Sequence, residues 1–555
     1  MKAPFPVSEG TMQSELTPRQ RQILGLLQAG KVNKEIASEL GIGLGTVKQH
    51  VVALFKKLNV RNRTMAAYAG TAKLRSGGNV NPSTLTTDAL LERRPCVVLS
   101  TALPEEAEDS VVRRLHGTLA SLAFDHDALF LARKGNAGDV IFGIQRVTEF
   151  DLLKAVRTAH AAYMDLSSLD LVLADKLSGG LTAGLAVASM KRFGGWSGEA
   201  IASSAIYFAR ELVQEAGIGR LAFGQSAQDL MLSFGIGNGE AVLPNVLFFH
   251  ELDKLRWTGE RFTFPLVDRD TELVRLKSAL KEVRSGAGHL IYLNGETGMG
   301  KSRLCREIVE LSLRDGGGAS LFRCQPLGSG EVLNNVLDGG VICLPEKVAE
   351  ILRAPPSHSP DVLIIDDFHL LVKDKQSLLL TEAQAGRAGR LVVFSGRSYG
   401  NNILEQFNIE LVHLGRLPVG VIEKLVRLVA SGSESKMRAS KVKSISKLAA
   451  GVPLFAVELA RHGESDMIEL PLLVIICGRL EGLPLDRKIL RAVARHGLST
   501  FGEIVAELGE AVELVKPAVD RAKASGVLFQ DQNDDDRISF THPILRQAIN
   551  QISME

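Results

Sequence analysis

Short apolar runs alternate with amphipathic stretches along most of the chain, and their spacing predicts its secondary structure. Between residues 265 and 415 the runs HLIYLN, SLFRC, VLIIDD, RLVVFSG and IELVHL are rich in β-branched residues, as buried parallel strands are. Helical stretches lie between these runs. The alternation predicts an α/β domain built on a parallel sheet.

A second region of mixed elements extends from residue 93 to residue 257. Its β-rich runs CVVLS, DVIFGI and LVLAD alternate with helical patterns such as LLKAVRTAHAAYM, which predicts an α+β domain. Residues 416–468 are largely helical in pattern, and we expect them to form a lid on the α/β domain. Residues 469–555 combine short helices with an apparent hairpin, GVLFQDQNDDDRISFTH.

The N-terminal part is patterned differently. Its first 75 residues predict an all-α head, and the Gly, Ser, Thr and Asn-rich stretch that follows predicts a linker. The fold class is therefore multi-domain. The predicted boundaries are 1–75 for the head, 76–92 for the linker, 93–257 for the α+β domain, 258–415 for the α/β core, 416–468 for the lid and 469–555 for the C-terminal domain.

Composition narrows the class of protein. With 555 residues, 45% hydrophobic and 23% charged, the chain has the make-up of several soluble globular domains, which excludes wholesale disorder. No apolar run reaches the ~18–20 residues of a membrane-spanning helix, and the first residues lack the apolar core of a secretory signal. Five scattered cysteines without CxxC spacing fit a reducing compartment. We therefore expect a cytoplasmic protein without a membrane partner.

The charge is distributed unevenly along the chain. Residues 1–75 carry 12 Lys and Arg against 4 Asp and Glu, whereas the other 480 residues carry 53 against 59. A basic head on a mildly acidic body indicates a polyanion partner for the head alone.

Residues 16–60 predict two helices joined by a tight turn. Gly41 ends the first helix, and Thr46 begins the second, with Gln49 completing a capping-box pattern. The apolar stripe of the second helix comprises Val47, Val51, Leu54, Phe55 and Leu58. Lys48, Gln49, His50, Val52 and Lys56 fall on or near its outer face. Gln and Lys near a helix N-terminus suit the base edges and phosphates of a major groove.

These residues resemble the LuxR-type helix-turn-helix. The resemblance is carried by Leu16-Thr17-Pro18-Arg19, Gly30, Lys34-Glu35-Ile36-Ala37, Thr46-Val47-Lys48, His50, Lys57-Leu58 and Arg61 to Thr64. Gln20 and Gly43 depart from the usual Glu and Ser, and Gly remains a passable N-cap. The resemblance implies DNA contacts by Lys34, Thr46, Val47, Lys48, Gln49, His50, Lys56 and Arg61. The alternative is a basic helical hairpin that serves only packing.

A glycine-rich segment, Gly295 to Ser302, fits the pattern G-x-x-x-x-G-K-[ST]. It follows a predicted strand and precedes a predicted helix, which is the context that makes the pattern specific for phosphate binding. Lys301 should reach the β- and γ-phosphates of a nucleotide, and the Ser302 hydroxyl should bind Mg²⁺. Backbone N–H groups of the loop complete the predicted phosphate site. Its other candidate residues are Gly295, Thr297, Gly298 and Gly300.

A second element supports the phosphate site. The run VLIIDD predicts a buried strand that delivers Asp366 and Asp367 to its C-terminal end. Asp366 is the candidate Mg²⁺ partner, and Asp367 is the candidate for orienting an attacking water. A turn-forming Asp pair is the alternative. A further predicted strand, RLVVFSG, ends at Arg397, which is a candidate for sensing the γ-phosphate.

These residues resemble the P-loop ATPase of STAND-type regulators within the wider AAA-like group. The resemblance includes the entry segment Phe264 to Leu273, the Walker B stretch Asp366 to His369, the GxP stretch Leu448 to Phe455 and the C-terminal Phe540-Thr541-His542-Pro543. It implies that Pro453 abuts the nucleotide and that residues 469–555 form a winged helix. It also implies a contact between His542 and the ADP β-phosphate; a buried, hydrogen-bonded histidine is the alternative.

Residues 93–257 resemble the class III nucleotidyl cyclase domain. The matching stretches are Arg93 to Leu99, Gly138-Asp139, GLTAGLAVASM and Ala205 to Leu212. Two-metal cyclization needs two carboxylates, but Ser100, Thr101 and Ala102 occupy the stretch of the first Asp, and Ile206 falls where the transition-state Asn should be. Asp139 and Arg210 remain. We expect no cyclase activity; an unrelated α/β domain is the alternative.

The resemblances together imply an ATP-dependent transcriptional regulator that uses ATP, ADP and Mg²⁺. ADP should hold a closed monomer, and ATP with an unknown inducer should permit self-association on promoter DNA, with RNA polymerase as a further partner and hydrolysis no faster than a switch requires. One alternative is an enzyme, either an active cyclase or a fast NTPase. Another is a signalling scaffold that does not bind DNA.

Overall fold

A computed structural model describes two units of the chain, residues 1–87 and 88–555. In the first unit it describes residues 18–28 and single positions between 36 and 54. In the second it describes residues 89–554, with gaps at 134, 238–244, 258–265, 328–329, 339–340, 359–360, 398–405, 432–436, 462–466, 482, 484 and 531–536. No helix in these ranges combines the length and hydropathy that crossing a bilayer requires.

The N-terminal head begins with helix α1 (Pro18–Gln28). Its described core consists of Ile23, Leu24, Ile36, Val47, Val51 and Leu54, each almost fully buried. The predicted stripe of the second helix is therefore confirmed at Val47, Val51 and Leu54, while Phe55 and Leu58 lie outside the described residues. Arg19 donates a hydrogen bond to the Leu40 carbonyl over 2.8 Å, which ties α1 to the following segment.

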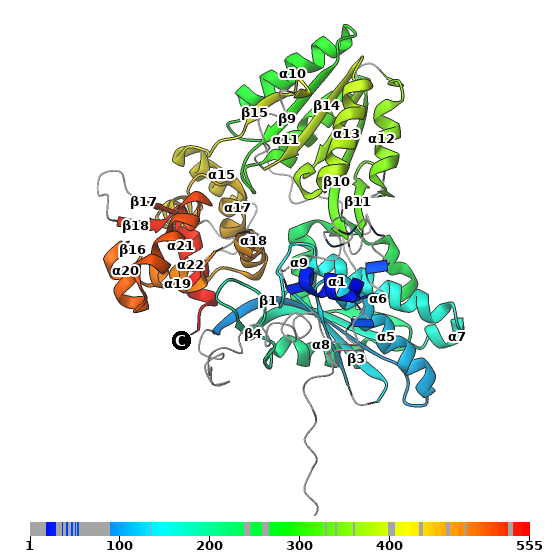
Figure 1. Cartoon of the computed structure of the whole chain (residues 1–555). Coiled ribbons are helices and arrows are strands. Elements are labelled where there is room, and N and C mark those ends of the chain that lie inside the picture. Colours follow the sequence, from blue (N-terminus) through cyan, green and yellow to red (C-terminus); the bar gives the residue numbers. More distant parts are fainter. Residues whose placement is uncertain are drawn as a thin grey trace, which may run out of the picture. The chain divides into compact units, whose positions relative to one another are not determined.

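The α+β domain contains a six-stranded sheet in the order β2-β3-β1-β4-β5-β7 (Figure 1). The order β-α-β-β-α-β of its first elements is the ferredoxin-like arrangement. Its elements are β1 (Leu90–Ala102), α5 (Asp109–Asp125), β2 (Leu129–Ala132), β3 (Ala137–Phe142), α6 (Asp151–Ser167), α7 (Leu171–Ala174), β4 (Ser178–Met190), α8 (Ser204–Ala216), β5 (Arg220–Phe223), α9 (Gln225–Phe234), β6 (Ile236–Gly237), β7 (Val246–Phe248), η2 (Phe249–Lys254) and β8 (Arg256–Trp257).

Alternation along β1 places helices on both faces of this sheet. Val97 and Leu99 share a core with residues of α5 and α6, whereas Cys96 and Val98 pack against Ala205 and Ala209 of α8. Strand β1 begins at Leu90, so the last residues of the predicted linker 76–92 belong to the sheet. The sequence did not predict this earlier start of the strand, because the three residues Leu90-Leu91-Glu92 are too few to show an alternating pattern.

The α/β domain contains a seven-stranded sheet in the order β12-β11-β10-β13-β14-β9-β15. Strands β10, β13, β14, β9 and β15 are parallel, and β11 and β12 extend the edge in antiparallel fashion. Its elements are α10 (Asp270–Arg284), β9 (His289–Asn294), α11 (Lys301–Arg314), β10 (Gly318–Leu327), β11 (Gly330–Asn335), β12 (Val341–Cys343), α12 (Pro345–Arg353), β13 (Asp361–Asp366), η3 (Phe368–Leu370), α13 (Lys373–Ala385), β14 (Arg390–Gly396) and β15 (Glu410–His413).

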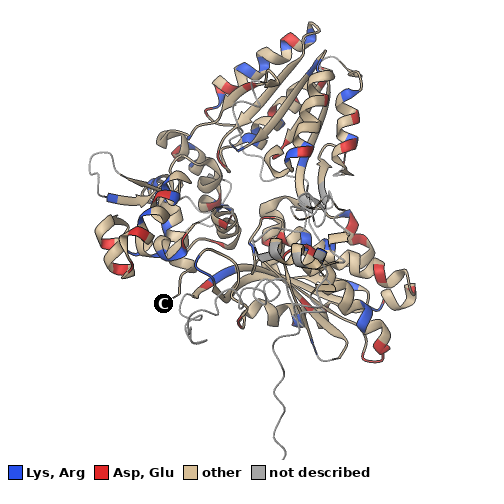
Figure 2. Ribbon diagram, viewed as in Figure 1, with Lys and Arg blue, Asp and Glu red and all other residues tan. Residues whose placement is uncertain are grey.

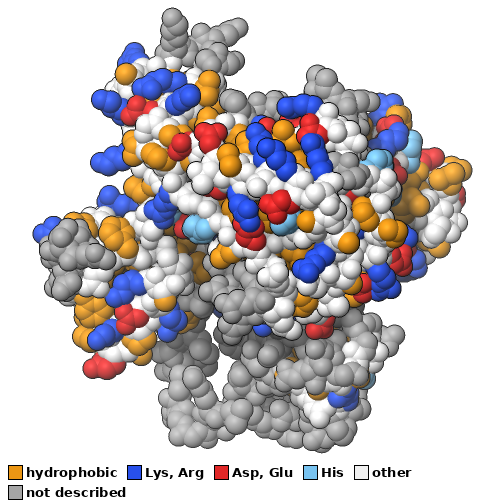
Figure 3. All heavy atoms as spheres, turned by 90° about the horizontal axis from the view of Figure 1, so that it is seen from above, with side chains coloured by type: hydrophobic (Ala, Val, Ile, Leu, Met, Phe, Trp, Pro, Cys, Tyr) orange, Lys and Arg blue, Asp and Glu red, His pale blue; other side chains and the backbone are white. Residues whose placement is uncertain are grey.

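The parallel sheet of this domain is buried on both faces, as its continuous apolar runs predict. Ile291 and Ile364 belong to the core shared with α10 and α11, and Tyr292 and Ile365 to the core shared with α12 and α13. The outer surfaces of these helices carry both charge signs (Figure 2), including the ion pairs Arg353–Glu382 and Lys375–Glu346. Figure 3 likewise shows Lys, Arg, Asp and Glu interspersed with hydrophobic side chains on the face that it presents.

Residues 416–468, predicted to be largely helical, contain helices α15 (Val419–Ser431), α16 (Ala439–Ala449) and α17 (Pro453–Arg461). The C-terminal domain has a three-stranded sheet in the order β16-β18-β17, and the predicted hairpin corresponds to β17 and β18. Its elements are α18 (Leu470–Glu481), α19 (Arg487–His496), β16 (Leu498–Thr500), α20 (Phe501–Leu508), α21 (Val512–Ala524), β17 (Leu528–Gln530), β18 (Arg537–Phe540) and α22 (Pro543–Ile552).

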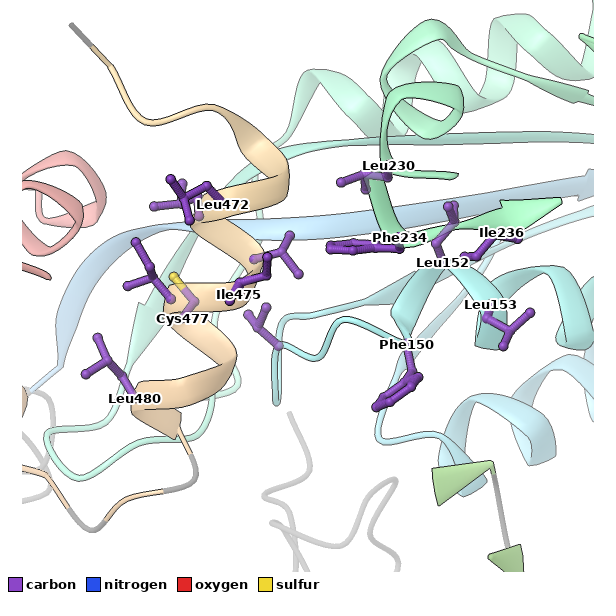
Figure 4. Close-up of a cluster of buried hydrophobic side chains, with 14 of the residues drawn as sticks. Phe150, Leu152, Leu153, Leu230, Phe234, Ile236, Leu472, Ile475, Cys477 and Leu480 are labelled. Atoms are coloured by element: carbon purple, nitrogen blue, oxygen red, sulfur yellow. The ribbon is translucent and has the colours of Figure 1, made fainter. Parts of the chain in front are cut away.

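Helix α18 is apolar on nearly every side, and it is buried between neighbours rather than amphipathic. Leu472, Ile475, Cys477 and Leu480 are buried in the core that also contains Phe234 of α9 (Figure 4). This helix therefore packs the C-terminal domain against the α+β domain.

Candidate nucleotide-binding site

The glycine-rich loop lies between the end of β9 and the start of α11, as its sequence predicts. Gly298 and Gly300 have φ values of +86° and +93°, in the left-handed region that favours glycine. A Cβ atom on Gly298 would lie 2.8 Å from the Leu454 Cβ, so only glycine allows the first turn of α17 to approach the loop. The Leu454 N–H donates to the Gly298 carbonyl over 3.2 Å.

A cavity of about 260 Å³ opens beside this loop. Of the predicted site residues, Gly295, Asp366 and His542 do not line it. Those that do line it are Thr297, Gly298, Gly300, Lys301, Ser302, Asp367, Arg397 and Pro453. Most of the residues predicted for the site, which come from four separate segments of the sequence, therefore lie around one cavity.

Lys301 is the first residue of α11 and is almost fully buried. Its Nζ donates to the carbonyls of Gly295 and Glu296 over 2.8 and 2.9 Å. Burial lowers the pKa of Lys301 from its usual value. The loop carbonyls thus hold the ammonium group in position at the point where helix and loop together favour phosphate oxygens.

Arg323, on β10, bridges the two residues predicted to bind Mg²⁺. Its Nη2 lies 2.7 Å from the Ser302 Oγ and 2.8 Å from the Asp366 Oδ2, and its Nε donates to the same carboxylate over 3.1 Å. Burial alone would raise the pKa of Asp366, but the Arg323 charge and hydrogen bonds from Ser395 and Ser302 outweigh it and lower the pKa.

The Ser302 hydroxyl and the Asp366 carboxylate are oxygen donors of the kind that Mg²⁺ takes. Both already share one cation, the Arg323 guanidinium. The donor set therefore fits the metal, and Arg323 has to shift before Mg²⁺ can bind between these two oxygens.

Asp367 follows the strand in a left-handed conformation, with φ of +55°. For a non-glycine residue this costs ~1–2 kcal/mol, and such outliers concentrate at functional sites. The Asp367 N–H donates to the Ser395 Oγ over 3.2 Å. Burial and the neighbouring Asp366 charge raise the pKa of Asp367 to about 7, which suits a group that accepts a proton.

Arg397 reaches the loop from the end of β14. Its Nε donates to the Thr297 Oγ1 over 3.0 Å, and the Tyr292 hydroxyl donates to its carbonyl over 2.8 Å. His369 also lines the cavity. Burial and the charge of Arg397 lower the pKa of His369 to about 4, so its imidazole is neutral near pH 7.

Glu296, in the loop, forms an ion pair with the C-terminal domain. Its carboxylate lies 2.7 Å from Nη2 of Arg479 on α18 and 3.4 Å from Nε2 of His542. His542 and Arg479 lower the pKa of Glu296 to about 2. The side chain of His542 is fully buried and lies 2.9 Å from Arg416. His542 is thus a buried, hydrogen-bonded histidine that contacts the loop through Glu296.

The sequence did not predict three arginines that contact the residues of this site. Arg323 stands alone in the apolar run LFRC, and a lone charge in a buried strand is a usable signal. Arg269, in the entry segment, donates to the carbonyls of Met299 and Gly415 over 3.1 and 2.7 Å. Arg479 gave no signal, because only the packing of α18 brings it to the loop.

In the α+β domain, Asp139 is held by other side chains. It accepts hydrogen bonds from Ser100 over 2.8 Å and from Arg210 over 2.6 Å, and Arg133 lies 3.3 Å away. Across the described ranges, no group of three or more His, Cys, Asp and Glu side chains is arranged to hold a metal.

The DNA-contact candidates are described only in part. Thr46 is exposed and His50 is half-buried. Val47 needs a correction, because its side chain is fully buried and packs in the core of the head instead of facing DNA. Lys34, Lys48, Gln49, Lys56 and Arg61 lie outside the described residues.

Three curated relatives resemble a short part of the chain. The chain is 54% identical over 52 residues to the putative HTH-type transcriptional regulator YhjB of Escherichia coli, which is 9% of this chain and 26% of that protein. It is 50% identical over 52 residues to the transcriptional regulatory protein LiaR of Bacillus subtilis, 9% and 25% of the two chains. The chain is 43% identical over 60 residues to the HTH-type transcriptional regulator MalT of Vibrio campbellii, which is 11% of this chain and 7% of that protein. The chain thus spans about a quarter or less of these relatives.

Among solved structures, the Holliday junction branch migration motor RuvB of Thermotoga maritima is 19% identical, covers 49% of this chain and 92% of its own, and has a TM-score of 0.30. The Walker-type ATPase of Pyrococcus abyssi is 13% identical, with coverage of 51% and 96% and a TM-score of 0.34. The guanylyl cyclase Cya2 is 16% identical; the match covers 28% of this chain and 87% of that protein, with a TM-score of 0.23. At such TM-scores these likenesses do not bear on the fold or function of the chain.

Two families match parts of the sequence directly. Residues 14–69 match the bacterial regulatory proteins of the luxR family, and residues 265–337 match the AAA ATPase domain. The first match contains the predicted helix-turn-helix, and the second contains the entry segment and the glycine-rich loop but ends before Asp366. The chain therefore contains a LuxR-type helix-turn-helix domain and an AAA ATPase domain.

Proposed function

We propose that this chain is an ATP-dependent, STAND-type transcriptional regulator of the LuxR family. The observation that carries the proposal is the presence, in one chain, of the LuxR-type head and a nucleotide cavity that brings Lys301, Ser302 and Asp367 together. Binding to promoter DNA would place the protein in the cytoplasm, with RNA polymerase as a further partner.

The residues of the cavity divide the work of holding a nucleotide. Backbone N–H groups of the loop and the Lys301 ammonium bind the phosphates. Ser302 and Asp366 would hold Mg²⁺, which supplies positive charge next to the β- and γ-phosphates. Asp367 orients the attacking water and accepts its proton, and Arg397 senses the γ-phosphate. Hydrolysis is slow, because the bound state rather than turnover is the output.

The link from nucleotide to conformation passes through Glu296. This residue belongs to the phosphate loop, yet its carboxylate binds Arg479 and lies close to His542 in the C-terminal domain. ADP favours the closed monomer in which these contacts hold, and ATP with an inducer favours an open form that self-associates. The switch requires a nucleotide that binds the two forms with different affinity.

A size measurement tests this proposal. Light scattering on the purified chain with ADP, with ATP and with a non-hydrolysable ATP analogue should give a monomer with ADP and a larger species with ATP or the analogue. DNA binding should strengthen in the larger species, since two linked heads bind paired half-sites with a raised effective concentration. An unchanged size in all three nucleotides would contradict the switch.

The α+β domain contributes no cyclase chemistry in this proposal. We infer that it keeps a cyclase-type fold and serves dimerisation or signal sensing. Ser100 in place of an acid, Ile206 in place of an amide and the ion pairs of Asp139 support this view. Cyclic nucleotide formed from ATP or GTP by the purified chain would contradict it.

The head gives a first prediction. Replacing Lys48 and His50 together by alanine should weaken binding to a promoter fragment by about ten- to a hundredfold, because groove contacts are worth ~1–3 kcal/mol each. Fluorescence anisotropy over a series of salt concentrations measures the effect. An unchanged affinity and salt dependence would contradict the assignment of the second helix as the DNA-binding helix.

The Glu296 link gives a second prediction. Glu296→Gln keeps the shape but removes the charge that holds Arg479, so self-association should need a several-fold lower ratio of ATP to ADP. Light scattering across that ratio measures the shift. Glu310→Gln, on the exposed side of α11, is the matched control and should leave the midpoint unchanged.

A further inference from the structure

A second cavity, of about 190 Å³, lies between the start of β1 and helices α18, α19 and α22. We call it the arginine pocket, because the guanidinium-bearing side chains of Arg94, Arg146, Arg487 and Arg491 line it. Figure 2 shows the basic start of β1 next to the charged turns of the C-terminal helices. Its volume equals that of about six waters, which suits a small metabolite.

The charges of the arginine pocket do not balance. Only Glu92 and Glu481 oppose its four arginines. Glu92 pairs with Arg487 and, over 3.4 Å, with Arg491, and Glu481 pairs with Arg94 and, over 3.2 Å, with Arg487. Glu92 and Arg94 are each only 2% exposed. Arg146 is exposed, so three guanidinium groups face two carboxylates in the interior of the pocket. Because an uncompensated buried charge is costly, the pocket favours an anion.

Two polar atoms of the arginine pocket have no hydrogen-bond partner among the described residues. They are the Arg491 Nε and the Ser553 Oγ, both buried from solvent. Arg491 is 8% exposed as a whole. A buried donor without an acceptor is rare and calls for a ligand or water. The remaining walls are apolar, among them Leu480, Leu490 and Ile552.

We propose that the arginine pocket binds a small organic carboxylate with a short aliphatic body. The carboxylate accepts from Arg491 and Ser553 and is attracted by Arg146, in the planar geometry that guanidinium groups favour. The aliphatic body lies against the leucine and isoleucine walls. The imbalance of charge, the two unpaired donors and the apolar walls support this class of ligand together.

Helix α18 couples the arginine pocket to the phosphate loop. Glu481, at its last turn, lines the pocket and accepts from the Val147 N–H over 2.7 Å. Arg479, two residues earlier, binds Glu296. The negative charge of a carboxylate held by Arg491 also attracts the neighbouring guanidiniums of Arg94 and Arg487, which weakens their pairing with Glu481 and shifts the helix end that carries Arg479. This coupling rests on the proposed nucleotide switch, whereas binding in the pocket does not.

Calorimetric titration of the full chain with butyrate, pentanoate and hexanoate tests the site. Affinity should rise about fourfold per methylene, and inorganic phosphate should bind more weakly than hexanoate. Arg491→Met should weaken hexanoate binding at least tenfold and Arg146→Met several-fold. Arg495→Met, one turn further along α19 and paired with Glu507 at the surface, is the matched control and should leave it unchanged.

The outcomes separate the possibilities. No hexanoate binding to the wild type, tighter binding of phosphate, or equal affinity in all variants would overturn the site. If Arg491→Met does not fold, the comparison of Arg146→Met with Arg495→Met decides. Saturating hexanoate should change the ADP affinity by fivefold or more, and no change would overturn the coupling. Lys301→Ala should keep hexanoate binding, so a failure of the nucleotide proposal leaves this test intact.

Discussion

Replacing Lys301 by alanine should remove nucleotide binding and ATP-dependent self-association together. The side chain is buried at the start of α11, where its ammonium group faces the loop that is proposed to hold the phosphates. Hydrogen bonds to charged groups contribute ~1.5–3 kcal/mol each, so the loss of one or two of them weakens ADP and ATP binding by at least about tenfold to a hundredfold. Calorimetric titration with both nucleotides measures this loss.

Lys281→Ala is the control for this variant, because Lys281 is exposed on α10 and outside the cavity. It should bind nucleotide and self-associate as the wild type does. A Lys301→Ala protein that fails to bind nucleotide but still activates transcription would refute the switch, and one that binds nucleotide normally would refute the site. Thermal melting of both variants separates these results from misfolding.

The fold of the α/β domain was largely predictable. Its strands are continuous apolar runs, because each is covered by helices on both faces, and such runs stand out in a sequence. The phosphate loop was predictable for a related reason: its glycines are required by backbone conformation and by the approach of Leu454. Two-sided burial of a strand and a backbone conformation that only glycine tolerates both restrict residue type locally, so a single sequence shows them.

Contacts between distant segments were not predictable. Glu296 lies in the loop of the α/β domain, whereas Arg479 of α18 and His542, just before α22, belong to the C-terminal domain. No local pattern marks any of them for ion pairing. The same holds for the arginine pocket, in which Glu92 and Arg491 lie almost 400 residues apart. Val47 illustrates another limit, since family likeness placed it among the DNA contacts while the periodicity placed it in the core, and the periodicity was right.

The guanidinium of Arg323 should be essential for stability in the absence of Mg²⁺. It neutralises Asp366 and lies 3.6 Å from Asp367, and the Arg323 and Asp366 side chains are 9% and 3% exposed. Removing one partner of a buried ion pair costs ~3–5 kcal/mol, because the other charge stays buried and unpaired. Arg323→Met should therefore lower the melting temperature clearly in calorimetry carried out with a chelator.

Millimolar Mg²⁺ should restore much of this loss in Arg323→Met and do little for the wild type. In the variant the Ser302 and Asp366 oxygens are open to the metal, and a ligand that binds only the folded form stabilises it; in the wild type the metal competes with the guanidinium. Arg275→Met, which breaks an exposed pair with Glu410, is the control and should cost ~0–1 kcal/mol with no Mg²⁺ effect. An equal response of Arg323→Met and wild type to Mg²⁺ would mean that Arg323 does not stand in the place of the metal.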